Sequence, residues 1–95
     1  VVDCLTLLVS NLLCADCSHK VIADKINKMI AILRKIKGRA VIVSNEVGLG
    51  IVPTNKLARN FRDIAGKVNQ IVAREADEVI FMVAGLPLKV KGGDK

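Results

Sequence analysis

Residues 41–53 read Val-Ile-Val-Ser-Asn-Glu-Val-Gly-Leu-Gly-Ile-Val-Pro. This stretch passes from an apolar run to a carboxylate, Glu46, then to a glycine-containing turn and to Pro53, which suits the first turn of a helix. An apolar run without alternation predicts a strand covered on both faces, here over residues 40–44. Ligands of open α/β sheets bind at the carboxyl ends of the strands, so Glu46 stands where a ligand is expected.

Helices are predicted on both sides of this strand. Upstream, Thr6 is expected to cap a short helix that runs to Leu12, and apolar spacings of four and three predict a longer helix over residues 20–37. Downstream, a second long helix is expected from Pro53 to residues 73–75. The predicted core stripe of the first long helix is Ile22, Ile26, Met29, Leu33 and Ile36, and that of the second is Leu57, Phe61, Ile64, Val68 and Ile71 or Val72.

Strands are predicted at both ends of the chain. Residues 1–3 read as the end of a strand whose beginning is expected to be missing, and residues 79–84 as a second buried strand. Residues 86–91 alternate and contain Pro87, which favours an edge strand. Strands interspersed with helices predict an α/β layered fold, with one domain over residues 1–91 and a flexible tail over residues 92–95.

The composition favours anionic partners. The formal net charge is +6 and the sequence pI is about 9.6, which suits nucleotides and polyphosphates. Nucleic acid is not expected, because the aromatic residues that stack on bases are nearly absent, and no stretch approaches the about 20 apolar residues that span a bilayer. Three cysteines without a disulfide pattern favour the cytoplasm. Because 52% of the 95 residues are hydrophobic, some apolar surface is expected to meet a missing segment or another subunit.

Two carboxylates, Asp3 and Glu46, each follow an apolar run. If their strands are parallel neighbours, both carboxylates emerge at one edge of the sheet. Mg²⁺ prefers oxygen ligands and keeps several waters, so one or two carboxylates beside a triphosphate suffice. The alternative is that Asp3 caps the following helix and Glu46 solvates a turn.

The second long helix has a polar face. Its members fall at spacings of four and three: Asn55, Arg59, Arg62, Gly66 and Asn69. The two arginines are expected to project together, and paired guanidiniums suit phosphate oxygens. The alternative is a solvated face with an ion pair between Arg59 and Asp63.

Cys14, Cys17 and His19 form a cluster that could bind a metal or act in redox chemistry. The second half of a zinc site is absent, however, and the haem-attachment spacing fails. A variable surface loop is the preferred interpretation.

Several of these segments together resemble one enzyme family. They are Val2 to Leu7, Ser10 to Leu13, Val43 to Pro53, Leu57 to Asp63 with Gly66, Asn69 and Gln70, Ala76 to Val79, and Ala84 to Leu88. The family is the bifunctional adenosylcobinamide kinase and adenosylcobinamide-phosphate guanylyltransferase of cobalamin biosynthesis. The resemblance covers nearly the whole chain.

The resemblance implies a P-loop, RecA-like nucleotide-binding fold and a homo-oligomer, typically a trimer. It also implies phosphorylation of adenosylcobinamide and GMP transfer from GTP through a guanylylated histidine, with Mg²⁺ and GTP or ATP. By resemblance, Asp3 is the acidic residue on the magnesium side, which binds Mg²⁺ directly or through water. Glu46 is the acid of the signature loop and the expected catalytic residue. The expected nucleotide-binding residues are Arg59, Arg62, Asn45 and Asn69.

The sequence departs from the family pattern in a decisive way, and Leu8 also stands where the family often has Trp. It contains no glycine-rich phosphate loop followed by Lys and Ser or Thr, and His19 lies outside the matching motifs. The expectation is therefore a carboxyl-terminal portion of the enzyme with negligible turnover on its own. The alternative is a non-catalytic basic α/β module that binds nucleotide or assembles with a partner.

Overall fold

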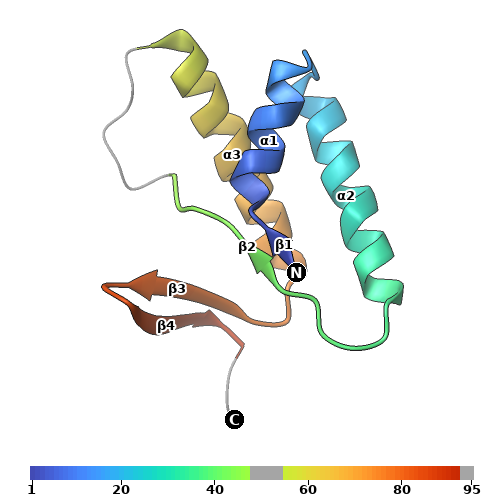
Figure 1. The fold of residues 1–95 in the computed structure, drawn as a ribbon, viewed down its shortest axis with the longest axis vertical. Helices are drawn as coiled ribbons and strands as arrows, with labels where there is room; N and C mark the ends of the chain where they lie inside the picture. Colours follow the sequence, from blue (N-terminus) through green and yellow to red (C-terminus); the bar gives the residue numbers. More distant parts are fainter. Residues whose placement is uncertain (48–54, 93–95) are drawn as a thin grey trace.

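The computed structural model describes residues 1–47 and 55–92. Three helices lie side by side, and two short pairs of strands lie toward one end of them (Figure 1). The elements in chain order are β1 (Val2–Asp3), α1 (Leu5–Cys14), α2 (His19–Lys35), β2 (Ile42–Val43), α3 (Lys56–Glu75), β3 (Val79–Val83) and β4 (Leu86–Lys91). The predicted α/β class and the predicted end of the second long helix are confirmed. Pro53 and the turn before it lie outside the described residues, as do residues 93–95 of the expected tail.

The strands pair in two separate sheets. β1 and β2 are parallel, with Val2 opposite Ile42 and Asp3 opposite Val43, whereas β3 and β4 form an antiparallel hairpin. The strands that lead to Asp3 and Glu46 are therefore parallel neighbours, which is the arrangement that would bring both carboxylates to one edge of the sheet. Among the described residues, the four strands do not join into the single layered sheet that was expected.

The core lies where the three helices meet. Its buried members from α1 are Leu5 and Val9, from α2 Ile22, Ile26 and Ile30, and from α3 Ile64, Ala65 and Val68. Both predicted stripes include residues that are less buried than expected. Ile36 is 55% exposed because α2 ends at Lys35 and Ile36 has extended backbone. Leu57, in the first turn of α3, is 71% exposed, because the buried part of α3 lies in its middle turns.

The helix starts differ from expectation in two places. Cys4, not Thr6, holds the N-cap position of α1, and Thr6 lies inside the helix with 5% exposure. Asn55, predicted on the polar face of α3, is its N-cap and accepts hydrogen bonds from the amides of Leu57 (2.8 Å) and Ala58 (3.2 Å). Asn side chains are among the best N-caps because they satisfy amides that have no partner within the helix.

The two apolar strands predicted to be buried on both faces are not. In β2, Val43 is 42% exposed, and in β3, Ile80 and Met82 are 46% and 58% exposed. Two-sided burial requires helices on both faces of a sheet, whereas here the three helices bury their apolar stripes against one another. The predicted strand over residues 86–91 is confirmed, and all six of its residues are exposed.

The hairpin turn follows from local sequence. Ala84 and Gly85 both have positive φ (51° and 76°), which a two-residue hairpin turn of type I′ requires. The Nζ of Lys91 donates to the carbonyls of Ala73 (3.1 Å) and Arg74 (2.6 Å) and so joins the hairpin to the end of α3. Within the described ranges, no helix combines the length and the apolar composition that crossing a membrane requires.

Candidate functional site

The carboxyl ends of β1 and β2 carry the two predicted acids. Asp3 is the last residue of β1 and is exposed. β2 continues into Ser44, Asn45, Glu46 and Val47, here called the 44–47 segment, in which Glu46 is exposed and Val47 is half-buried. Because Asp3 pairs with Val43, both carboxylates belong to the same edge of this strand pair.

Residues of α1 and α3 hold the 44–47 segment. The side chain of Asn69 accepts a hydrogen bond from the Ser44 hydroxyl (2.5 Å) and donates to the Asn45 carbonyl (2.9 Å). The Nε of Arg62 donates to the carbonyl of Val47 (2.8 Å). On the opposite side, the Asn45 amide donates to the hydroxyl of buried Thr6 (3.3 Å). The segment is thus tied to two helices through its side chains and its backbone.

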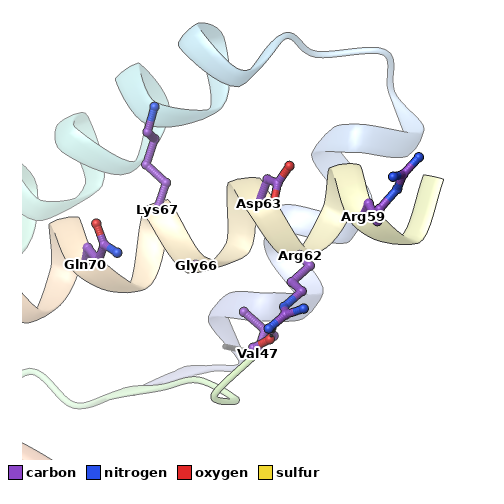
Figure 2. Close-up of a pocket in the computed structure, with 7 residues that line it drawn as sticks. All are labelled: Val47, Arg59, Arg62, Asp63, Gly66, Lys67 and Gln70. Carbon is purple, nitrogen blue, oxygen red and sulfur yellow. Dashed lines mark hydrogen bonds between the residues drawn. The ribbon is translucent and has the colours of Figure 1, made fainter. Parts of the chain in front are cut away.

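A hollow lies between Val47 and one face of α3 (Figure 2). It is open to solvent, encloses about 500 Å³ and is here called the α3 hollow. Its lining residues are Val47, Arg59, Arg62, Asp63, Gly66, Lys67 and Gln70. Three of them are basic and one is acidic, so the hollow carries a net positive charge that favours an anion.

The two arginines line this hollow from different sides. Figure 2 shows the side chain of Arg62 extending from α3 to Val47 and that of Arg59 pointing away from Val47. The expectation that both face one surface is confirmed, but the expectation that they project together is wrong, because the Val47 carbonyl draws Arg62 toward it. The alternative ion pair between Arg59 and Asp63 does not form in the described part of the chain.

Gly66 leaves the middle of the hollow open. A Cβ built at this position would lie 3.8 Å from the Cγ2 of Val47. That is an ordinary van der Waals separation, so the fold does not itself require glycine there. The missing side chain instead leaves room on the face of α3 between Arg62 and Gln70.

Asn45 and Asn69, both predicted to bind nucleotide, use their side chains within the protein. Neither lines the α3 hollow. The structure therefore brings Val47, Arg59 and Arg62 to the hollow, whereas Asn45 and Asn69 hold the 44–47 segment and do not line the hollow.

The cysteine and histidine cluster does not assemble. Cys14 is exposed, Cys17 packs partly against the core, and both are free thiols. His19 begins α2, and its Nε2 lies 2.6 Å from the Oδ1 of Asn60. Within residues 1–47 and 55–92, no group of three or more His, Cys, Asp or Glu side chains could hold a metal ion.

Sequence reasoning missed three features of the site. Lys67 and Gln70 line the hollow. Lys67 lies four residues after Asp63, and Gln70 lies eight residues after Arg62, so helical spacing would have placed both on the face of α3 that borders the hollow. Thr6 is the buried anchor of Asn45. The pKa of the neighbouring Cys4 thiol is lowered, mainly by a hydrogen bond with the Thr6 hydroxyl and to a smaller extent by one with the Leu7 backbone.

These features define a small α/β protein with a cation-lined hollow beside the carboxyl end of a parallel strand pair. The model of the family described as cobinamide kinase / cobinamide phosphate guanyltransferase matches residues 1–90. The chain belongs to this family.

Curated relatives agree with this assignment. The chain is 44% identical to the bifunctional adenosylcobalamin biosynthesis protein CobU of Salmonella typhimurium, over 94% of this chain and 56% of the relative. It is 42% identical to the protein CobP of the same description from Pseudomonas aeruginosa, over 96% of this chain and 52% of the relative, and 40% identical to CobU of Escherichia coli. The chain thus spans about half the length of the curated relatives it matches.

Proposed function

We propose that this chain acts in adenosylcobalamin biosynthesis, as part of an enzyme that phosphorylates adenosylcobinamide and transfers GMP from GTP to adenosylcobinamide phosphate. The observation that carries the proposal is the family match over residues 1–90. The relatives' printed names, which describe bifunctional adenosylcobalamin biosynthesis proteins, support it. The α3 hollow supports it on physical grounds, because nucleoside triphosphates are anions.

The proposed site uses the residues of the hollow and its edge. Arg59 and Arg62 bind phosphate oxygens, and guanidinium groups suit this task because they donate in a fixed fork. Such fixed donors stabilise the charge that develops during phosphoryl or nucleotidyl transfer. Glu46 is the proposed catalytic carboxylate. Asn45 and Asn69, predicted from the sequence as nucleotide-binding residues, contribute in this proposal by holding the 44–47 segment.

Mg²⁺ is the proposed metal of this site. The donor set fits, because Asp3 offers an exposed carboxylate at the end of β1 and Mg²⁺ in nucleotide sites takes one or two protein carboxylates plus water and phosphate oxygens. Bound there, directly or through water, the metal would neutralise charge on the phosphates. Asp3 would orient it, and the α3 cations would contact the rest of the polyphosphate.

The finer features of the proposal come from the family resemblance. Residues 1–91 would form the carboxyl-terminal portion of a P-loop, RecA-like nucleotide-binding domain, with residues 92–95 as a flexible tail. The protein would work in the cytoplasm as a homo-oligomer, a trimer as in the family. Exposed apolar side chains on β3 and β4, among them Met82 and Leu86, are compatible with further protein contacts.

A second candidate is a non-catalytic basic α/β module that binds nucleotide or assembles with a partner. The net charge of +6 and the exposed apolar hairpin favour it. The two candidates share the anion-binding hollow and differ in whether cobinamide is also bound.

The test is binding of Mg–GTP and Mg–ATP to the 95-residue chain, measured by titration calorimetry. We expect Arg59→Ala to weaken binding by roughly tenfold, as loss of a charge-assisted contact predicts. Arg39→Ala is the matched control, because it removes the same charge from an exposed residue outside the hollow. Equal weakening by both variants would contradict a site in the hollow. Binding of adenosylcobinamide to the nucleotide-loaded chain would favour the enzyme over the module.

A further inference from the structure

Asn69 makes two hydrogen bonds to consecutive residues of the 44–47 segment. Its amide oxygen accepts from the Ser44 hydroxyl at 2.5 Å, and its amide nitrogen donates to the Asn45 carbonyl at 2.9 Å. An amide side chain can do both at once, since it carries an acceptor oxygen and a donor nitrogen on one carbon. Asn69 thereby fixes the direction in which the chain leaves β2.

Thr6 meets the same segment from the opposite side. Its hydroxyl is the acceptor for the Asn45 amide at 3.3 Å, and Thr6 is 5% exposed on α1, within the core. Thr6 also shares a contact with the Cys4 thiol at 3.4 Å. Asn45 is therefore held through its side chain by α1 and through its carbonyl by α3.

The next two residues are the proposed catalytic carboxylate and a wall of the α3 hollow. Glu46 follows Asn45 directly, and Val47 forms one wall of the α3 hollow while its carbonyl accepts from Arg62. A rotation of the backbone at Asn45 would move the Glu46 side chain and would disturb the hydrogen bond from the Arg62 Nε to the Val47 carbonyl. The geometry of one candidate carboxylate and one candidate cation thus depends on how Asn45 is held.

We infer that Asn69 and Thr6 are positioning residues, which set the orientation of Glu46 and Arg62 toward a bound magnesium–nucleotide without touching it. This inference rests on the proposed nucleotide-binding function for its consequence, but the hold on the 44–47 segment stands on the hydrogen bonds alone. Two measurements on the same variants separate these two parts.

The decisive variant is Asn69→Asp, which keeps the size of the side chain. The carboxylate can still accept from Ser44, but it has no proton for the Asn45 carbonyl and faces that oxygen with a negative charge. Asn27→Asp is the matched control, because Asn27 is exposed on α2 and outside the hollow, and the chemical change is identical. Thr6→Val tests the other side by removing the acceptor of the Asn45 amide while keeping the shape.

The first measurement is the backbone order of residues 44–47 in the whole 95-residue chain, given by ¹⁵N relaxation. We expect Asn69→Asp to lower the backbone order parameters there from the roughly 0.85 of rigid backbone toward about 0.6, because the segment loses its hydrogen bond from Asn69, while the order parameters in the middle of α2 stay as in the parent. Asn27→Asp should leave the 44–47 segment unchanged. Unchanged order parameters of this segment in Asn69→Asp would overturn the inference, whether or not the chain binds nucleotide.

The second measurement is the dissociation constant for Mg–GTP, with the melting temperature of each variant as a check on folding. We expect Asn69→Asp to weaken binding by roughly tenfold and Asn27→Asp to change it by less than about twofold. Binding that stays unchanged in Asn69→Asp despite lower order parameters of the 44–47 segment would overturn the positioning role. If the parent chain itself binds no nucleotide, the proposed function fails, and the order parameters still decide whether Asn69 holds the segment. Should Asn69→Asp not fold, Thr6→Val and Ser44→Ala supply the same two comparisons.

Discussion

Replacing Gly66 with alanine should stabilise the protein and weaken nucleotide binding at the same time. Gly66 lies in the interior of α3, where glycine is about 1 kcal/mol less favourable than alanine. The added methyl group would lie 3.8 Å from the Cγ2 of Val47, which is an ordinary contact and costs no strain. The helix preference therefore decides the sign, and we expect a gain of about 1 kcal/mol in the free energy of unfolding.

For a chain of this size, such a gain raises the melting temperature by roughly 4–8 °C. The assay is thermal and urea unfolding followed by circular dichroism. Gly38→Ala is the matched control, because Gly38 has a φ of +104° with nothing within 4 Å of a built Cβ. The same methyl group should there destabilise the chain by about 1 kcal/mol, through backbone strain alone.

Binding provides the opposing half of this prediction. The methyl group added at position 66 would stand in the middle of the α3 hollow, so we expect the affinity for Mg–GTP to fall in Gly66→Ala and to stay unchanged in Gly38→Ala. A Gly66→Ala variant that melts below the parent would refute the packing argument. A variant that melts higher and binds nucleotide as tightly as the parent would refute the placement of the ligand against α3.

Three further predictions concern the core, the hairpin and the charge of the site. Ile64→Ala should lower the free energy of unfolding by about 2–5 kcal/mol, measured by urea unfolding, because Ile64 is fully buried where the helices meet; a loss below about 1 kcal/mol would contradict this core. Lys91→Ala should speed amide hydrogen exchange across β3 and β4, because it frees the hairpin from the end of α3. The control Lys89→Ala removes an exposed ion pair with Glu78 and should have little effect on exchange. Equal effects of the two variants would contradict the anchoring role of Lys91. Affinity for Mg–GTP should fall as KCl is raised from about 0.05 to 0.5 M, since salt screens exposed cations, and affinity that is independent of salt would argue against a cationic site.

Local patterns in the sequence predicted the helices well. The apolar spacing around Ile22 and Ile26, and around Ile64 and Val68, depends only on the helical period, and these residues are fully buried. The end of α3 at Glu75 also followed from the pattern. Ile30 was missed because Met29 and Leu33 satisfied the same spacing, and only the direction from which α1 and α3 approach selects the buried position.

The sheets could not be predicted from composition. The apolar run that includes Ile80 and Met82 reads the same whether or not helices cover it, and the helices that could cover it pack against one another instead. Covering depends on tertiary neighbours, which a local pattern does not contain.

The candidate site was predicted in part. The spacing of Arg59 and Arg62 placed both on one hollow, because that spacing is a property of the helix. It could not give the directions of their side chains, since the Arg62 side chain donates a hydrogen bond to the backbone carbonyl of Val47, which lies 15 residues away in the sequence. The internal roles of Asn45 and Asn69 depend in the same way on contacts between distant elements.

The most direct test of the account is to map Mg–GTP onto the ¹⁵N-labelled chain by chemical-shift perturbation. The account predicts saturable shifts at Val47, Arg59, Arg62 and Gly66, with the hairpin of β3 and β4 unmoved. Saturable shifts confined to that hairpin or to α2, with the face of α3 unchanged, would contradict it.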